Sequence, residues 1–213
     1  MHIAAMVLAA GESSRMGEPK QLLRFGSHTL LDLAIGAVSL TEIERVVVVL
    51  GAGADAIQER LWLDECEVVV NARWREGMIT SVKAGLNHLG EWPEFLAVLP
   101  ADFALVDRRT MAALALRALS RGAGIPQLVR PSYRGQSGHP VVLGPEAIKA
   151  ARGLSDAVGL DSLVQAYKSV GELVEVDDPA VRFDIDTPAD YQRALNAWQA
   201  RTQGREAYVQ ALT

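Results

Sequence analysis

Two cations in a short loop are the first residues of this sequence whose types and spacing could do chemistry. Arg15 and Lys20 lie in a stretch from 8 to 21 that contains glycines and serines and directly follows an apolar run. Glycines let a backbone approach a ligand closely, and successive N–H groups in such a loop form an anion-binding concavity. Arginine matches phosphate oxygens with a planar fork, and lysine adds a mobile point charge. The loop therefore predicts a phosphate-binding site, and the alternative is an ordinary strand-to-helix loop with surface cations.

Carboxylates at two remote positions are the next candidates. Asp102 follows the apolar run 95–99, so we expect it at the carboxyl end of a buried strand, the edge at which open α/β sheets bind ligands. Asp107 is the better cap for the helix that follows, which leaves Asp102 free for chemistry. Further along the chain, alternation puts Asp184 and Asp186 on the same face of an extended segment. Spacing alone does not bring Asp102 and Asp186 together.

The elements that must position these residues are predicted by apolar runs and by helical periodicity. Apolar runs predict strands at 3–8, 46–50, 67–71, 95–99, 126–130 and 173–176. Apolar residues at helical spacing predict helices at 29–40, 54–61, 77–86, 111–121, 145–152, 160–167 and 188–200. This alternation indicates an α/β fold with a mostly parallel, twisted sheet and helices on both faces. We expect a single domain over 1–200 and a polar tail over 201–213.

The composition limits the classes of function. A chain of 213 residues with 49% hydrophobic content can build one sizeable core but not a second substantial domain. The net charge of −5 argues against a nucleic-acid surface, so an anionic ligand needs local cations. The single cysteine, Cys66, excludes an intrachain disulfide and a cysteine metal cluster. Because no apolar run approaches the ~18 residues of a membrane span and no signal peptide is recognised, we expect a soluble, cytoplasmic protein that does not bind membranes.

A second glycine-containing turn, Gly51-Ala52-Gly53, follows the predicted strand 46–50 and raises the alternative of a dinucleotide site. The third glycine of that fingerprint is replaced by Ala56, and the acidic residue expected some 20 positions later is ambiguous. The pattern therefore favours a tight strand-to-helix turn over a nicotinamide site.

The loop from 8 to 21 reads Leu-Ala-Ala-Gly-x-Ser-x-Arg-Met-Gly-x-Pro-Lys-Gln. It resembles the nucleotide-binding signature of the MobA-like nucleotidyltransferases, a family that includes molybdenum cofactor cytidylyl- and guanylyltransferases. It is not a Walker loop, which needs Gly-Lys-Ser/Thr after four spacer residues. The resemblance covers nearly the whole chain, from 6 to 195, and implies a Rossmann-like fold of the nucleotide-diphospho-sugar transferase type.

Three further stretches resemble motifs of the same family. The stretch 77–86 matches a motif that lines the nucleotide pocket, although a helix cap and close helix packing would explain the same residues. The stretch 138–141, Gly-His-Pro-Val, resembles an acceptor-side turn, and a purely structural role remains open. The stretch 184–191 resembles one in which an acidic residue holds metal. Where the family usually has Asp-x-Pro-x-Val, this chain has Asp102-Phe-Ala-Leu-Val, which makes the loop less rigid.

The resemblance implies that a phosphate oxygen of an acceptor attacks the α-phosphorus of a nucleoside triphosphate and releases pyrophosphate. Ala10 favours CTP, because guanylyl enzymes of the family more often read Leu-Ala-Gly-Gly at the loop start. The implied acceptor is molybdopterin carrying molybdenum, with a molybdoenzyme or its chaperone as a further partner. The alternatives are a guanylyl or sugar-phosphate nucleotidyltransferase of the same fold, a nicotinamide-dependent oxidoreductase, and a nucleotide sensor without catalysis.

The resemblance also assigns roles to individual residues. We expect Mg²⁺ as the cofactor, because it prefers hard oxygen ligands and binds few protein groups. Asp184 is expected to play a supporting role beside the metal. The implied site consists of the catalytic cations Arg15 and Lys20, the nucleotide-binding residues Leu8, Ala9, Ala10, Gly11, Gly77, Ser81 and Asp102, the acceptor-binding residues Gly138 and His139, and the metal ligands Asp102 and Asp186.

Overall fold

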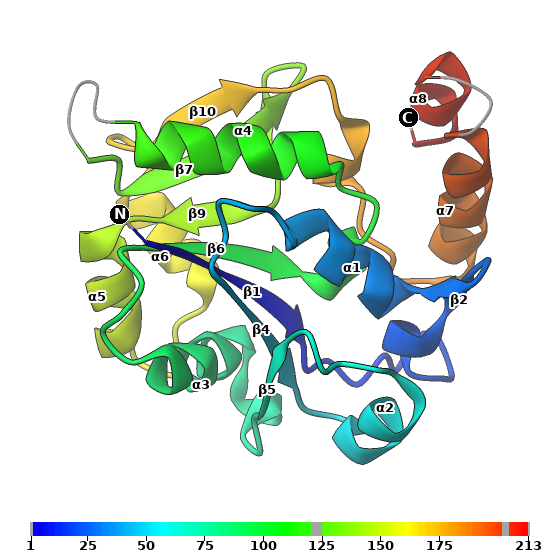
Figure 1. Cartoon of the computed structure of the whole chain (residues 1–213), viewed down its shortest axis with the longest axis horizontal. Helices are drawn as coiled ribbons and strands as arrows, with labels where there is room; N and C mark the ends of the chain where they lie inside the picture. The colour runs from blue at the N-terminus through cyan, green and yellow to red at the C-terminus, as the bar shows by residue number, and fades with distance from the viewer. Residues whose placement is uncertain (1, 121–124, 202–204, 213) are drawn as a thin grey trace.

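The computed structural model describes residues 2–120, 125–201 and 205–212. Eight strands form one sheet in the order β10-β7-β9-β6-β1-β4-β5, with β8 paired to β7 (Figure 1). The strands of this sheet are β1 (Ile3–Ala9), β4 (Arg45–Leu50), β5 (Glu67–Val70), β6 (Phe95–Pro100), β7 (Leu128–Tyr133), β8 (Gln136–Ser137), β9 (Val141–Leu143) and β10 (Glu172–Glu175). A small antiparallel ribbon is formed by β2 (Arg24–Phe25) and β3 (His28–Thr29).

Strand β1 lies at the centre of the parallel part of the sheet. It pairs in parallel with β4 on one side and β6 on the other, so that Met6 lies opposite both Val47 and Val98. All seven residues of β1 are buried, as expected for a parallel strand whose two faces are covered by helices. Strand β9 runs antiparallel to both of its neighbours, β6 and β7, and β10 pairs in parallel with β7.

The helices divide between the two faces of the sheet because alternate residues of each strand point to opposite sides. Ala5 and Val7 of β1 belong to one apolar cluster, and Ala4 and Met6 belong to the other. The first cluster is covered by α1 (Leu30–Val38), α2 (Ala54–Arg60), α4 (Arg108–Leu119), α7 (Pro188–Ala200) and α8 (Arg205–Leu212), and the second by α3 (Met78–Leu89), α5 (Pro145–Gly153) and α6 (Leu160–Ala166). The predicted α/β architecture, with a mostly parallel sheet and helices on both faces, is confirmed.

Several element boundaries differ from those expected from the sequence. The helix expected at 111–121 begins at Arg108, because the Asp107 side chain caps it by accepting a bond from the N–H of Arg109 at 2.8 Å. Its expected end at 121 lies outside the described residues. The strand expected at 126–130 runs from Leu128 to Tyr133, and the short strands β8 and β9 were not predicted.

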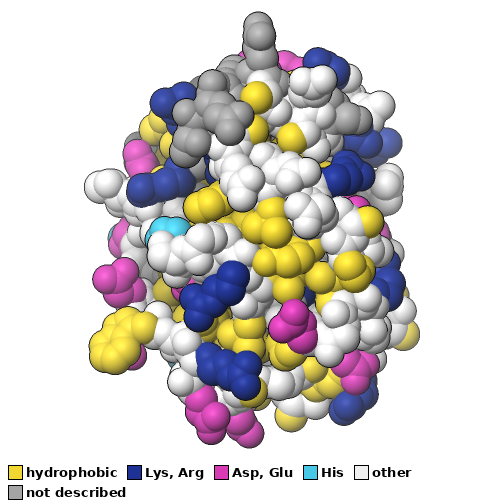
Figure 2. All heavy atoms as spheres, turned by 90° about the vertical axis from the view of Figure 1, so that its right-hand side faces the viewer, with side chains coloured by type: hydrophobic (Ala, Val, Ile, Leu, Met, Phe, Trp, Pro, Cys, Tyr) yellow, Lys and Arg dark blue, Asp and Glu magenta, His cyan; other side chains and the backbone are white. Residues whose placement is uncertain are grey.

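The C-terminal segment, which the sequence suggests is a polar tail, contains the helix α8. Tyr208 and Leu212 of α8 are buried in the first apolar cluster, and Tyr208 donates a hydrogen bond to the carbonyl of Leu105 at 3.1 Å. Figure 2 views the molecule from the side of α7 and α8, where acidic and basic side chains are interspersed around apolar ones. Among the described residues, no helix has the length and apolar character needed to cross a membrane.

Candidate active site

The candidate active site lies where the parallel strands β1 and β6 end (Figure 1). The loop after β1 leads into a 3₁₀ turn, Lys20–Leu22, and β6 leads directly into another, Ala101–Phe103, which carries Asp102. The extended segment before α7 crosses this edge, and the N–H of its buried residue Ile185 donates to the carbonyl of Asp102 at 3.1 Å. This backbone bond fixes the segment that carries Asp186 beside Asp102.

Lys20 bridges the carboxylates of Asp102 and Asp186, whose proximity could not be predicted from their spacing in the sequence. Its ammonium group donates to Asp102 Oδ2 at 2.7 Å and to Asp186 Oδ1 at 3.1 Å. The Arg15 guanidinium donates to the other oxygen of Asp186, with Nη2 and Oδ2 2.8 Å apart. The Lys20 side chain is only 14% exposed, whereas that of Arg15 is 65% exposed. Four of the predicted residues therefore form one network, with an inner and an outer cation.

The electrostatics of this network favour the charged forms of Lys20 and Asp186. Burial lowers the pKa of Lys20, but the charge of Asp102 and the hydrogen bonds to both carboxylates outweigh burial and raise this pKa. Burial raises the pKa of Asp186, but the hydrogen bond and charge of Lys20, together with Arg15, outweigh it and lower this pKa. Since the two cations balance the two carboxylates, an incoming triphosphate would need additional positive charge.

The donor set fits a divalent cation. Asp102 Oδ1 is buried and has no hydrogen-bond partner, which leaves one hard oxygen of the cluster open to a cation or to its water. Asp184 adds a third carboxylate, and its pKa is raised first by burial and then by the negative charges of Asp186 and Asp102. No group of three or more acidic, histidine or cysteine side chains is poised to chelate metal within the described parts of the chain. The protein therefore offers few ligands, as expected where phosphate oxygens complete the shell.

A buried glutamine shapes the loop that carries the cations. The Gln21 side chain donates to the carbonyls of Ala9 and Gly11 at 2.7 and 3.2 Å and is almost completely buried. Ser13, which has a positive φ of 58°, accepts a bond from the N–H of Lys20 at 3.0 Å. These contacts curl the loop back on the end of β1. In the sequence, Pro19-Lys20-Gln21 together with Ala10 favours cytosine by resemblance, but these residues do not predict the buried contacts of Gln21 with the loop backbone.

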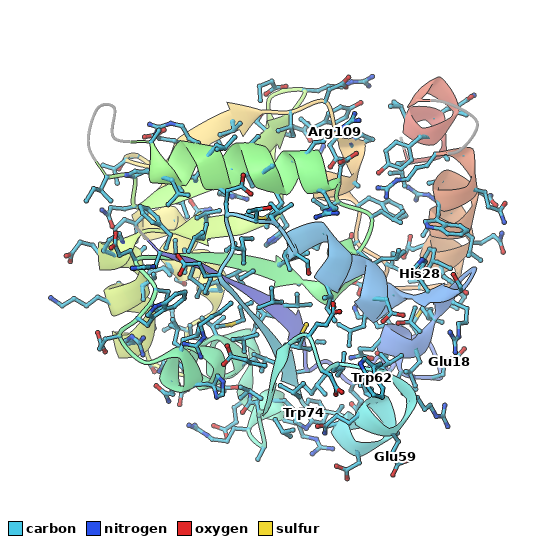
Figure 3. All side chains as sticks on the ribbon, viewed as in Figure 1. Glu18, His28, Glu59, Trp62, Trp74 and Arg109 are labelled. Carbon is cyan, nitrogen blue, oxygen red and sulfur yellow. The ribbon has the colours of Figure 1, made fainter. Side chains whose placement is uncertain are left out.

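The pocket next to this network contains most of the residues predicted to bind nucleotide. Trp74, labelled in Figure 3, lines this pocket from the segment that follows β5. Trp74 and Met78 were not predicted to lie here. Gly77 is not among the residues that line the pocket; it precedes α3 with a φ of 114°, a conformation that favours glycine. The pocket is lined by Leu8, Ala9, Ala10, Gly11, Lys20, Gln21, Trp74, Met78, Ser81, Pro100, Ala101 and Asp102.

A buried asparagine holds the first turn of α3. The Asn71 amide, at the end of β5, donates to Thr80 Oγ1 at 2.9 Å and to Ser81 Oγ at 3.0 Å. The Thr80 hydroxyl in turn donates to the carbonyl of Gly77 at 2.8 Å. This network orients Ser81 toward the pocket. The role of Asn71 was not predicted from the sequence. The one feature that could have indicated it is its position, as a polar residue directly after an apolar strand.

The turn at Gly138 and His139 lies beside the 3₁₀ turn that carries Asp102, because the His139 ring contacts Phe103. The backbone N–H groups of these two residues donate to the carbonyls of Pro131 and Val181, and the His139–Pro140 peptide bond is cis. Gly138 packs so closely on Val181 that a side chain would not fit. The pKa of His139 is lowered to about 4, mainly by burial and also by the charge of Arg130, so its imidazole is neutral at neutral pH. The ring stacks obliquely on Phe103, with centroids 4.6 Å apart.

The turn at Gly51-Ala52-Gly53 forms a tight connection between β4 and α2. Gly53 is the residue before α2 and adopts the left-handed conformation, with φ 66°. A Cβ at Gly51 would lie 2.7 Å from the Ala10 carbonyl and from Trp74 Cβ, so packing explains this glycine. A cavity lies beside the turn and is lined by Gly11, Glu12, Pro19, Gly51, Ala52, Gly53, Trp74 and Arg75.

Comparison with known proteins supports a nucleotide-transferring family. A family model described as "MobA-like NTP transferase domain" matches residues 5–170. The nicotine blue oxidoreductase of Paenarthrobacter nicotinovorans is 29% identical over 91% of this chain and 96% of its own length. The molybdenum cofactor cytidylyltransferase of Escherichia coli is 23% identical over 89% of this chain and 93% of its own.

Solved structures share the fold. The homologue of Mycobacterium tuberculosis Rv0371c from Mycobacterium sp. strain JC1 is 26% identical, with a TM-score of 0.80 over 93% of this chain and 98% of that one. A nucleotidyl transferase from Methanothermobacter has a TM-score of 0.78 at 23% identity, covering 94% of this chain and 99% of its own. Rv0371c of Mycobacterium tuberculosis in complex with manganese has a TM-score of 0.72 at 22% identity, covering 92% of this chain and 98% of its own.

Proposed function

Because this chain belongs to the MobA-like NTP transferase family, it is a nucleotidyltransferase, and we propose that it transfers CMP from CTP to a phosphorylated small molecule and releases pyrophosphate. The observation that carries this proposal is the network in which Lys20 bridges Asp102 and Asp186 beside the pocket. The family model ends before Asp186, so the role proposed for Asp186 rests on its contacts with Lys20 and Arg15.

The proposed reaction forms a bond between an acceptor phosphate oxygen and the α-phosphorus, and breaks the bond from that phosphorus to pyrophosphate. A phosphate monoester is mostly ionised near neutral pH, with a second pKa of about 6, so the acceptor needs no general base. Catalysis then consists of aligning the reacting groups and stabilising the growing negative charge. Lys20, which is mostly buried and held by two carboxylates, would bind the α-phosphate, and the exposed Arg15 would bind the leaving pyrophosphate.

Asp102 and Asp186 would hold a divalent ion, which when bound supplies positive charge to the phosphate oxygens. The free oxygen of Asp102 and the balanced charge of the network support this assignment. The neighbour Rv0371c has been crystallised with manganese, and we propose Mg²⁺ as the ion in this protein. We propose that Gly11 and the backbone N–H groups of the loop after β1 bind the triphosphate of the nucleotide.

The preference for cytosine is proposed from the loop start. Ala10 is buried, and its carbonyl accepts a bond from the N–H of Ala52 at 3.1 Å, so its methyl group is fixed at the pocket wall with Leu8 and Ala9. A methyl group in place of hydrogen narrows the pocket, which disfavours the larger purine. The relative from Escherichia coli is by name a cytidylyltransferase. A guanylyl or sugar-phosphate nucleotidyltransferase is the alternative.

Molybdopterin carrying molybdenum is the proposed acceptor, and a molybdoenzyme or its chaperone would receive the product. Gly138 and His139 are proposed to face this acceptor on the side of Asp102 away from the nucleotide pocket. A cytoplasmic location is part of the same proposal.

Two measurements test the proposed function. The first is a thermal-unfolding screen of the four nucleoside triphosphates with Mg²⁺, in which CTP should raise the midpoint most, because a ligand bound only by the folded state stabilises it. The second is pyrophosphate release from labelled CTP with molybdopterin as acceptor. If GTP turns over and CTP does not, the base assignment is wrong. If neither turns over, the acceptor is wrong, and sugar phosphates are tested next.

A nicotinamide-dependent oxidoreductase is a second candidate, because one relative is by name an oxidoreductase. The cavity beside Gly51, Ala52 and Gly53 is where we would place a dinucleotide. Titration with NADH separates the two candidates. Saturable binding that is lost in Gly53→Val but kept in Arg15→Ala would favour the oxidoreductase.

A further inference from the structure

Three buried side-chain atoms in the described residues lack a hydrogen-bond partner: Asp102 Oδ1, Arg130 Nε and His139 Nδ1. Buried polar atoms in folded proteins are nearly always paired, so each exception needs an explanation. These three belong to neighbouring segments, since β6, which precedes Asp102, pairs with β9, and β9 pairs with β7, which carries Arg130. His139 precedes β9 by two residues. Asp102 Oδ1 is already assigned to the divalent ion, whereas Arg130 Nε and His139 Nδ1 can both donate, so these two indicate a place where a ligand accepts hydrogen bonds.

Strand geometry places Arg130 on the face of the sheet that α5 and α6 cover. Leu128, two residues earlier in β7, packs in the apolar cluster of those helices, and alternate strand residues share a face. The turn that carries His139 lies beside this part of β7, because the N–H of Gly138 donates to the carbonyl of Pro131, the residue after Arg130, at 3.0 Å. Consistent with this proximity, the charge of Arg130 contributes to lowering the pKa of His139.

Arg130 differs from the other half-buried arginines in having no ion-pair partner. Arg45 is paired with Glu67, and Arg117 with Glu172, whereas no carboxylate in the described residues lies within ion-pair distance of Arg130. Burial lowers the pKa of Arg130 and outweighs the charge of Asp161, which acts in the opposite direction. An uncompensated guanidinium in a half-buried position destabilises the free protein. Its presence is explained if an anion completes the site.

We propose that Arg130, together with the imidazole of His139, binds an anionic group of the acceptor, of the phosphate monoester class. The inference rests on the proposed function in that it places the acceptor on the β7–β9 side of Asp102. The guanidinium N–H groups would donate to the anion's oxygens, and Nδ1 of His139 can donate a further bond in its Nδ1–H tautomer. Because His139 is neutral, Arg130 supplies the positive charge of the pair.

The test uses inorganic phosphate as the probe and Arg130→Met as the variant. Phosphate could also bind the loop that carries Arg15 and Lys20, so binding is measured with that loop filled by the best-stabilising nucleoside triphosphate and Mg²⁺. Wild type should bind phosphate by calorimetry, and Arg130→Met should bind about tenfold more weakly or not at all, since hydrogen bonds to a charged group are lost. Arg109→Met, on the exposed surface of α4, is the matched control and should bind as wild type does.

A stability readout separates anion binding from a structural role. In phosphate-free buffer Arg130→Met should unfold at a higher temperature than wild type, because an unpaired half-buried charge has been removed, and Arg130→Lys should keep part of the phosphate binding. Unchanged phosphate binding in Arg130→Met, or a lower unfolding temperature without phosphate, would overturn the inference. If no nucleoside triphosphate stabilises wild type, the proposed function fails. The Arg130 site is then tested in an Arg15→Ala, Lys20→Ala background.

Discussion

At the scale of single residues, the charge of Lys20 determines how the free site is arranged. Its ammonium group donates to both Asp102 and Asp186, the two carboxylates proposed to hold a divalent ion. In the free protein the lysine compensates the two carboxylates. In the proposed reaction Asp102 and Asp186 would hold the divalent ion, and Lys20 would donate to phosphate oxygens. One side chain would thus prevent repulsion in the free state and contribute to catalysis in the bound state.

Replacing Asp102 with asparagine should slow nucleotidyl transfer strongly. The change keeps the shape of the side chain but removes the charge that pairs with Lys20 and that would hold the metal. Loss of one preorganised electrostatic group costs about 3 kcal/mol of barrier, or roughly a hundredfold in rate. Pyrophosphate release measures the effect, and Asp186→Asn should behave similarly. Asp107→Asn is the matched control, because asparagine also caps helices well; an Asp102→Asn rate within threefold of this control would rule out the role.

Asp184 should limit stability at neutral pH. Its pKa is raised by burial and by the charges of Asp186 and Asp102, so the folded state binds this proton more tightly than the unfolded chain does. The free energy of unfolding therefore falls as pH rises through the raised pKa. Asp184→Asn should be more stable than wild type at pH 7. The difference should shrink as the pH falls through the raised pKa, and it should be gone below pH about 4, where unfolded aspartate is also protonated. Urea unfolding at the two pH values measures this difference.

The same variant tests the assignment of the metal ligand. Because Asp184 is given a supporting role, Asp184→Asn should retain more activity than Asp186→Asn. An inactive Asp184→Asn beside an active Asp186→Asn would mean that the metal belongs to Asp184.

At the scale of elements, the start of α7 holds Asp186 in place. Thr187 and Asp190 form a reciprocal capping box, in which the N–H of Thr187 donates to Asp190 Oδ2 at 2.9 Å and the N–H of Asp190 donates to Thr187 Oγ1 at 3.2 Å. Thr187→Ala should lower the free energy of unfolding by about 1 kcal/mol. It should also lower the affinity for Mg²⁺ with nucleotide, since Asp186 is the residue before the cap. Gln192→Ala, on the exposed side of α7, should change neither quantity, and equal effects of the two changes would contradict this coupling.

The elements that the sequence predicts are those with strong local signals. Strand β1, the loop with Arg15 and Lys20, and the Thr187-Pro188 helix start all carry such signals, and the structure contains each of them. Strand β9 has only three residues, too few for periodicity to show. The bridge from Lys20 to Asp102 and Asp186 depends on tertiary contacts between remote segments, so only the family resemblance suggested it. Gln21 and Asn71 act through backbone and hydroxyl partners, which composition and periodicity do not reveal.

At the scale of the whole molecule, the C-terminal helix pair supports both segments that carry the carboxylates. Helix α7 begins directly after the segment with Asp186, and α8 packs against α7. Tyr208 of α8 donates to the carbonyl of Leu105, three residues after Asp102, and Arg201 donates both to this carbonyl and to the Tyr208 hydroxyl. Helix α8, which lies in the region expected to be a polar tail, thus contacts the segment that follows Asp102.

Truncating Tyr208 should therefore weaken the fold and the site together. Tyr208→Ala removes a buried ring from the first apolar cluster, and aromatic-to-alanine changes in cores cost about 3 kcal/mol or more. Tyr208→Phe keeps the ring and loses the hydroxyl bond to Leu105, which should cost about 1 kcal/mol. Turnover should fall in the order wild type, Tyr208→Phe, Tyr208→Ala, because the Leu105 segment becomes less constrained. Urea unfolding and pyrophosphate release measure the two effects, with the exposed Gln210→Ala as control. If Tyr208→Ala unfolds and turns over as this control does, α8 has no part in holding the Asp102 segment.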